Sequence, residues 1–295
     1  MKEIVVISGK GGTGKTSLTA SFAVLGGESL VTADCDVDAA DMHILLEPDF
    51  SKAEDFYSGV LAVIDPNLCT GCGECDRVCR FDALEEKDGI YSVIPLNCEG
   101  CSYCARICPQ EVIRMEDQNV GEWYESRIKT GTVMVHARLG IGAENSGKLV
   151  AKVKNEAKRI AREQGREIVL VDGSPGIGCP VVSSLSGADF VVFVTEPTVS
   201  GLHDLKRVHE LVRKFGIPAG CIINKADLNP ETAELVKEFL AEAKIRHLAD
   251  LPYNESFTRA MVQGKTIVEV DNGNLKTSIS DCWQNILALV NEQGE

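Results

Sequence analysis

Gly9-Lys-Gly-Gly-Thr-Gly-Lys-Thr16 is the stretch that decides the fold of this chain of 295 residues. It follows an apolar segment at 3–8, which predicts a buried strand, and precedes a segment from Gly14 to about Leu25 that predicts a helix. Such a glycine-rich turn lets backbone N–H groups surround phosphate oxygens, and the start of the helix adds its positive dipole end. The pattern therefore predicts a nucleotide phosphate site beside a parallel sheet.

Two side chains of this loop have specific expected roles. Lys15 should reach the β- and γ-phosphates, and the Thr16 hydroxyl should bind Mg²⁺. The backbone of the loop and the first helical turn supply the other expected contacts to ATP or ADP, from Gly9, Gly11, Gly12, Thr13, Gly14 and Ser17.

Beyond the loop, apolar segments alternate with amphipathic ones. The expected strands are Ser29–Ala33, Glu167–Val171, Phe190–Thr195, Ala219–Ile223 and Arg246–Leu251. The expected helices are Lys148–Gln164, Gly201–Phe215, Pro230–Ala243 and 276–291. This order predicts an α/β fold with a mostly parallel, doubly wound P-loop NTPase sheet. The pattern is interrupted between about Asp65 and Asp117.

The interruption contains eight cysteines in two runs of identical spacing. The runs are Cys69-x2-Cys72-x2-Cys75-x3-Cys79 and Cys98-x2-Cys101-x2-Cys104-x3-Cys108, and Pro109 follows the second. This is the thiolate spacing of a bacterial two-cluster iron–sulfur module. Zinc sites or free thiols are the alternatives, but zinc sites prefer two separated cysteine pairs. We therefore predict a small α+β, bacterial ferredoxin-like domain at 62–116, inserted into an ATPase domain made of 1–61 and 117–295.

In two-cluster ferredoxins, the fourth cysteine of each run ligates the other cluster. On that pattern, one [4Fe–4S] cluster takes Cys69, Cys72, Cys75 and Cys108, and the other takes Cys98, Cys101, Cys104 and Cys79. Arg80 stands where the pattern often has proline. It either faces solvent or raises the potential of the nearby cluster through its positive charge.

Two aspartate motifs stand at the ends of predicted strands, Asp34-Cys-Asp36 and Asp172-Gly-Ser-Pro-Gly176. Together with Lys10, the second lysine of the loop, they resemble the two switches and the deviant phosphate loop of the MinD superfamily of ATPases. The resemblance covers nearly the whole chain. The cysteine segment is similar to that of superfamily members with an inserted ferredoxin domain.

The resemblance implies a role for each of these residues. Lys10 reaches across an ATP-dependent homodimer to the nucleotide of the partner. Asp36 orients or deprotonates the attacking water. Asp34 and Asp172 act on Mg²⁺ through water molecules, and the Gly176 N–H senses the γ-phosphate.

A third motif, Asn224-Lys-Ala-Asp227, ends another predicted strand on the same edge of the sheet. It is similar to the base-binding motif of related nucleotide hydrolases, so Asn224 is assigned to the base. The turn at Pro252-Tyr253 is expected to flank the base. A plain turn is the alternative interpretation.

Other polar and sulfur-bearing residues are harder to interpret. Cys35, Cys221 and Cys282 lie in apolar stretches and are expected to be packed thiols. Cys179 follows the second switch and is either structural or a ligand of a cluster that bridges two subunits. The polar stretches 136–140 and 144–148 form either a solvated loop or a contact to a partner, with Arg138 and Lys148 as the candidate contacts.

The charge of the chain limits its partners. The net charge of −14, from 44 acidic and 30 basic residues, argues against nucleic acid and against an anionic membrane surface. It is explained either by solubility or by a docking face for a basic redox partner. Cysteine-rich chains without a targeting segment or membrane span keep reduced thiols in the cytoplasm. The acidic stretch 281–295 also lacks the basic residues with which MinD anchors to membranes.

These features define three functional hypotheses. The first is an ATPase whose nucleotide state gates electron transfer through two [4Fe–4S] clusters to a partner protein. The second is an accessory ATPase for the assembly of a metal cofactor or an iron–sulfur cluster. The third is a non-redox positioning ATPase with structural clusters. All three require ATP or ADP, Mg²⁺ and two clusters.

Overall fold

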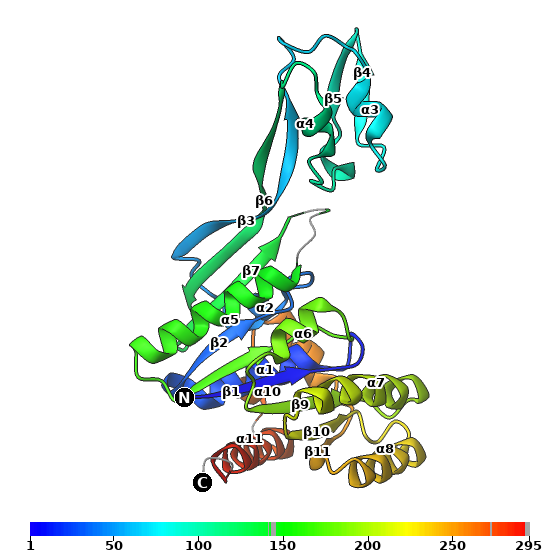
Figure 1. The fold of residues 1–295 in the computed structure, drawn as a ribbon. Helices are drawn as coiled ribbons and strands as arrows, with labels where there is room; N and C mark the ends of the chain where they lie inside the picture. Colours follow the sequence, from blue (N-terminus) through cyan, green and yellow to red (C-terminus); the bar gives the residue numbers. More distant parts are fainter. Residues whose placement is uncertain (141, 143–145, 272, 293–295) are drawn as a thin grey trace. The chain divides into compact units, whose positions relative to one another are not determined.

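The computed structural model describes residues 1–140, 142, 146–271 and 273–292. The chain divides into two compact units, drawn in Figure 1. We call the first the sheet unit; it contains Met1–Glu54, Trp123–Arg138 and Ser146–Glu295. We call the second the cysteine unit; it contains Asp55–Glu122 and Leu139–Asn145. The cysteine unit extends beyond the expected range of 62–116 because two long strands carry the chain into it and out of it.

One large sheet has the strand order β11-β10-β9-β1-β8-β2-β7-β6-β3. Its strands are β1 (Lys2–Ile7), β2 (Leu30–Asp34), β3 (Lys52–Ile64), β6 (Ile113–Arg127), β7 (Val133–Leu139), β8 (Ile168–Asp172), β9 (Phe190–Thr195), β10 (Ala219–Asn224) and β11 (Arg246–Leu251). Every neighbouring pair from β11 to β7 is parallel. The predicted α/β fold with a mostly parallel sheet is therefore confirmed.

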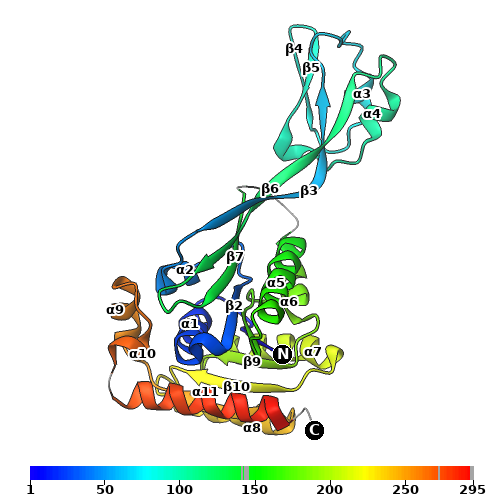
Figure 2. The ribbon, with the colours of Figure 1, turned by 90° about the vertical axis from the view of Figure 1, so that its left-hand side faces the viewer.

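Helices cover both faces of this sheet. They are α1 (Lys15–Gly26), α2 (Met42–Leu46), α5 (Ser146–Glu163), α6 (Cys179–Leu185), α7 (Val199–Phe215), α8 (Pro230–Glu242), α9 (Ser256–Val262), α10 (Ile267–Val270) and α11 (Asn274–Glu292), with a 3-10 turn at Gly27–Ser29. In Figure 2, α1 and α11 lie on one face, and α5 and α6 lie on the other. The helix ends follow local chemistry: the Thr198 side chain caps α7, and Gly216 ends it in a left-handed conformation.

The largest side chains of the sheet unit meet between α1 and α11. Phe22 stacks on Trp283 with ring centroids 5.2 Å apart, and both side chains are fully or almost fully buried. Aromatic pairs of this geometry contribute packing energy beyond their buried area. This contact fixes α11 against the helix that begins at the phosphate loop.

Three strands of the large sheet were not predicted from the sequence: β3, β6 and β7. The outer parts of β3 and β6 are exposed and polar, including Glu54, Asp55, Glu116 and Asp117. They show no run of apolar residues, which was the signal used to find strands. A solvated loop was one of two interpretations of 136–140, and it does not hold at His136, which lies within β7 and is 4% exposed.

The cysteine unit has little regular structure. Its elements are the antiparallel hairpin of β4 (Leu84–Lys87) and β5 (Ile90–Val93), the one-turn helices α3 (Glu74–Val78) and α4 (Tyr103–Ile107), and a 3-10 turn at Pro95–Asn97. Its core consists of Ala62, Ile64, Cys75, Val112 and Ile113. Among the described residues, no helix of either unit is long and apolar enough to span a membrane.

Candidate functional site

The phosphate loop connects the central strand β1 to α1. Gly12 and Gly14 have positive φ values of 78° and 91°, a region that side chains with a Cβ rarely adopt. A Cβ on Gly14 would lie 2.5 Å from Nδ2 of Asn224, and a Cβ on Gly9 would lie 2.5 Å from the backbone of Asp204. Glycine is therefore required at both positions by the close packing of the loop against neighbouring elements.

Lys15 is buried at the centre of this site, with 6% of its side chain exposed. Its Nζ lies 2.9 Å from Oδ2 of Asp172 and 3.3 Å from Oδ2 of Asp36. Burial lowers the pKa of Lys15, but the carboxylates of Asp172 and Asp36 outweigh burial and hold that pKa above its ordinary value. Three residues that the sequence analysis assigned to the site thus lie together, and the lysine stays charged.

Asp172 is held by two hydroxyl groups of α1. Thr16 Oγ1 donates to Oδ2 of Asp172, and Thr19 Oγ1 donates to Oδ1, both at 2.8 Å. Sequence analysis missed Thr19. It lies three residues after Thr16, so both hydroxyls face the same side of the helix. That spacing was the signal available for finding it.

Asp34 has an oxygen without a partner. The carboxylate is buried; its Oδ1 accepts the Asp36 N–H at 3.1 Å, and its Oδ2 has no hydrogen-bond partner among the residues that the structure describes. Burial first, and then the nearby charge of Asp172, raise the pKa of Asp34 well above its usual value. A buried carboxylate oxygen without a partner, on a group that the charge of Asp172 reaches, fits a hydrated Mg²⁺ ion, which prefers oxygen ligands and keeps several waters.

The two switch motifs are hydrogen-bonded to each other and to the loop. The Cys35 N–H donates to the Asp172 carbonyl at 2.8 Å, and Ser174 Oγ donates to the Cys35 carbonyl at 2.7 Å. The Gly176 N–H donates to the Ser8 carbonyl at 2.9 Å. This N–H must leave Ser8 before it can bind a γ-phosphate.

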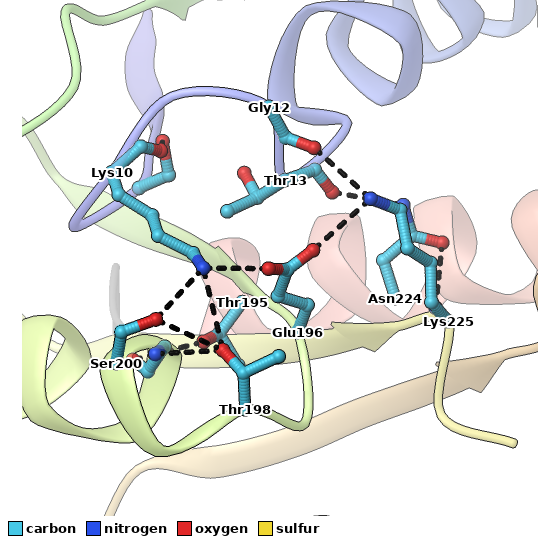
Figure 3. A network of polar contacts seen from close by, with 11 residues as sticks. Lys10, Gly12, Thr13, Thr195, Glu196, Thr198, Ser200, Asn224 and Lys225 are labelled. Carbon is cyan, nitrogen blue, oxygen red and sulfur yellow. Dashed lines mark hydrogen bonds and ion pairs between the residues drawn. The ribbon is translucent and has the colours of Figure 1, made fainter. Parts of the chain in front are cut away.

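Lys10 is bound within its own subunit, as Figure 3 shows. Its Nζ lies 2.6 Å from Oε1 of Glu196, 3.3 Å from the Thr198 hydroxyl and 3.0 Å from the Ser200 hydroxyl. Glu196 directly follows β9, the parallel neighbour of β1. Sequence analysis missed Glu196, because a single glutamate after a strand matches no motif.

Glu196 also binds a second lysine. Its Oε2 lies 3.0 Å from Nζ of Lys225, which also donates to the Gly12 carbonyl at 3.2 Å. Burial opposes a charged Glu196, but the hydrogen bonds from Lys10 and Lys225 lower its pKa. The carboxylate therefore stays ionised between two cations.

Asn224 braces the phosphate loop from the end of β10. Its Nδ2 donates to the Thr13 carbonyl at 2.8 Å, and its Oδ1 accepts the Lys225 N–H at 3.0 Å. The side chain is buried. Nearby, Asp227 Oδ1 accepts the Tyr253 N–H at 2.6 Å, so the exposed Pro252–Tyr253 turn lies beside the Asn224 motif.

The eight cysteines of the two runs surround two separate cavities in the cysteine unit. Cys69, Cys72, Cys75 and Cys108 line one cavity of about 340 Å³, open solvent at its mouth included. Cys79, Cys98, Cys101 and Cys104 line the other, of about 360 Å³. Each cavity takes three cysteines from one run and the fourth from the other. No three His, Cys, Asp or Glu side chains of the described residues lie close enough together to hold a single metal ion.

The two runs share their backbone geometry as well as their spacing. Gly71 and Gly100 both have positive φ, and a Cβ at either would overlap a backbone carbonyl oxygen, of Gly89 and Val60 respectively. Gly73 and Ser102 also correspond, with φ values of 76° and 62° before α3 and α4. The sequence repeat is therefore a structural repeat.

The thiols of the other four cysteines do not line either cysteine cavity. Cys35, Cys221 and Cys282 are buried thiols, and Cys179 is exposed at the start of α6. The candidate partner contacts Arg138 and Lys148 are exposed, as is Arg80. Glu144 and Asn145 lie outside the described residues.

A buried loop lysine paired with carboxylates at the ends of parallel strands defines a P-loop nucleotide-binding protein. Residues 4–267 match the family of the CobQ/CobB/MinD/ParA nucleotide binding domain. The chain belongs to this family.

Comparisons of sequence find two kinds of similar protein. Uncharacterized protein MJ0578 of Methanocaldococcus jannaschii is 34% identical over 230 residues, which are 77% of this chain and 79% of that protein. Ferredoxin-1 of Rhodobacter capsulatus is 50% identical over 30 residues, 10% of this chain and 46% of the ferredoxin.

Comparisons of structure agree on the fold. The cell division ATPase MinD of Pyrococcus furiosus superposes with a TM-score of 0.58 at 18% identity, over 98% of this chain and 99% of that one. MinD of Pyrococcus horikoshii, solved with Mg-ADP, superposes with a TM-score of 0.57 at 18% identity, over 97% and 95% of the two chains. At this identity the comparison establishes a MinD-like fold.

Proposed function

We propose that this chain is a Mg²⁺-dependent ATPase whose nucleotide state gates electron transfer through two [4Fe–4S] clusters to a partner protein. One observation carries the proposal: the two cysteine runs exchange their fourth members, so that four thiols line each of two cavities. Crossed ligation of this kind belongs to two-cluster ferredoxins. When bound, such clusters supply one-electron redox chemistry.

The donor set favours clusters over zinc. Each cavity is lined by three cysteines at successive x2 spacing and a fourth from the other run, whereas zinc sites prefer two separated cysteine pairs. Burial raises the pKa of Cys75 to about 11, so a thiolate at that position needs a bound cation. The short match to a ferredoxin supports the same assignment.

The sheet unit supplies the residues for ATP hydrolysis. Lys15 exchanges its carboxylate partners for the β- and γ-phosphates, while Thr16, Asp34 and Asp172 hold a hydrated Mg²⁺. Asp36 accepts the proton of the attacking water. Burial raises the pKa of Asp36, and the charge of Lys15 only partly offsets that effect, so its carboxylate is a better base than an exposed aspartate.

Chain connectivity suggests how the two activities are coupled. The cysteine runs lie between the first switch, which ends at Asp36, and the second, which begins at Asp172. Both switches also bind the phosphate loop or each other through backbone hydrogen bonds. A change at the γ-phosphate therefore moves segments that continue into β3 and α5, and these lead to and from the cysteine unit.

Redox titration tests this coupling directly. The cluster potentials are measured anaerobically at fixed salt, with and without a non-hydrolysable Mg-ATP analogue. A coupling of about 1–3 kcal/mol, typical between linked sites, shifts a one-electron potential by roughly 40–130 mV. Nucleotide affinity should differ between the redox states by the same free energy. Lys15→Ala is the control, because it should abolish the shift. Equal potentials and equal affinities would contradict the proposal.

A second function is favoured by the exposure of Cys72 and Cys101. One cysteine of each cavity reaches solvent, as a protein that hands over a cluster requires. In that case ATP would control docking of an assembly partner. Incubation with a cluster-free ferredoxin distinguishes cluster assembly from electron transfer. Only an assembly protein should lose iron to this acceptor in a nucleotide-dependent way.

A further inference from the structure

The strongest contact of Lys10 is made inside its own subunit. A lysine ammonium has three N–H donors, and Lys10 has three partners: Glu196, Thr198 and Ser200. All of its donors are used. Lys10 must therefore give up a charge-assisted hydrogen bond of 2.6 Å before it can bind anything else.

Glu196 is held in place by a second lysine, so it should stay behind when Lys10 moves toward a partner subunit. Its second oxygen is held by Lys225 at 3.0 Å, and Lys225 is itself tied to the Gly12 carbonyl. Only 16% of the Glu196 side chain is exposed. The two lysines differ in their other hydrogen bonds. Lys225 donates to the Gly12 carbonyl of the phosphate loop, whereas Lys10 donates to the Thr198 and Ser200 hydroxyls at the start of α7.

We propose that Glu196 is a positioning residue that retains Lys10 in its own subunit and so sets the nucleotide concentration at which two chains pair. The inference rests on the proposed ATPase function and on the role that the family resemblance implies for Lys10, contact with the partner's nucleotide across an ATP-dependent homodimer. Phosphates replace the carboxylate as the counter-charge of Lys10. Pairing then costs the free energy of the contact to Glu196.

The test is Glu196→Gln, which keeps the shape of the side chain and removes its charge. Sedimentation analysis follows the dimer fraction as a non-hydrolysable Mg-ATP analogue is added. The variant should pair at roughly three- to tenfold lower analogue concentration than the unchanged chain, as expected for a partly buried ion pair. Analogue binding to dilute monomer should not change.

Glu156→Gln is the matched control. Glu156 lies on α5, is 17% exposed and also bonds two cations, Lys152 and Arg159. Its loss should leave the pairing midpoint unchanged.

A Lys10→Ala background tests whether Glu196 acts on pairing through Lys10 or through Lys225. If Glu196 acts through Lys10, then Glu196→Gln has no effect on pairing once Lys10 is absent. An effect that persists there would assign Glu196 to the Lys225 contact and overturn the proposal. An unchanged midpoint in the single variant would also overturn it.

Amine acylation with mass spectrometry gives a readout that needs no dimer. Lys10 should be modified several-fold faster in Glu196→Gln than in the unchanged chain, with Lys152 as the internal reference. Equal rates would contradict the proposal. Neither experiment reads cluster potentials, so redox-silent clusters would refute the proposed function and leave this result intact.

Discussion

The two units of this protein are stabilised in different ways. The core of the sheet unit is a large apolar cluster that includes Phe22, Phe190 and Trp283. The core of the cysteine unit has five buried residues, with cysteines such as Cys69, Cys98, Cys104 and Cys108 packed against it. Units below about 70–80 residues rarely gain enough from apolar burial alone and use metals or disulfides instead.

The cysteine unit is also more acidic than the rest of the chain, which makes it harder to stabilise by apolar packing alone. Thirteen acidic and five basic residues lie between Asp55 and Glu122, whereas the whole chain has 44 and 30. Repulsion among like charges opposes a compact state. The comparison predicts that the sheet unit folds on its own chemistry, while the cysteine unit depends on the proposed clusters to fold.

Removal of iron should have the largest effect. We expect anaerobic chelation to unfold the cysteine unit, because metal binding and folding are coupled in small metal domains. Hydrogen exchange should show full loss of protection in β4, β5, α3 and α4, while nucleotide binding by the sheet unit persists.

Single cysteine variants sharpen this result. Cys72→Ser should lose one cluster, about four of about eight irons, whereas Cys179→Ser, outside both cavities, should keep all of them. A chelated protein with a protected cysteine unit would refute the comparison.

Lys15→Ala should have the next largest effect. It removes the charge that faces the phosphates and leaves the buried carboxylate of Asp172 without its cation. We expect at least a roughly hundredfold loss of ATP affinity, about 3 kcal/mol, by calorimetry. Iron content should not change. Lys152→Ala, on the surface of α5, is the control; affinity of Lys15→Ala within threefold of normal would contradict the site.

Trp283→Ala probes the apolar core of the sheet unit. Loss of a fully buried tryptophan should cost about 3–5 kcal/mol, measured by urea unfolding with circular dichroism. Leu235→Ala, at a side chain that is 51% exposed, should change stability by less than about 0.5 kcal/mol. If Trp283→Ala also released iron, the two units would not be independent.

The last prediction concerns His136 and the dependence of stability on pH, an effect that is absent at neutral pH. Desolvation by burial, followed by the charge of His43, lowers the pKa of His136 to about 4, below its ordinary value of about 6.5. The unfolded chain therefore binds more protons between these values. Stability is complete above pH 6.5 and falls as pH drops toward 4, by roughly 3 kcal/mol.

A variant isolates this contribution from other titrating groups. His136→Gln should flatten the slope between pH 6.5 and 4, measured by hydrogen exchange in the sheet unit. His203→Gln should keep the slope, because that side chain is 69% exposed. An unchanged slope in His136→Gln would exclude His136 as its source.

Local patterns predicted much of the fold and the site. Lys15, Thr16 and Asp172 were found from fixed offsets to strand and helix ends, and the structure brings them into contact. Strands β8, β9 and β10 were found within one residue at each end, because each is a buried, mostly apolar run. The exposed, polar parts of β3 and β6 lack such a run, so their sequence resembles a loop.

What the sequence alone determined is the chemistry that lies within short segments: the phosphate loop, the aspartates at strand ends and the thiolate spacing. These depend on backbone geometry over a few residues, which residue types set directly. Only the tertiary structure decided which groups from distant segments meet. Glu196 lies 186 positions from Lys10 yet binds it at 2.6 Å, and Asn224 braces Thr13 from another strand. Such contacts follow from strand order, because parallel strands bring their carboxyl ends to one edge whatever their separation along the chain.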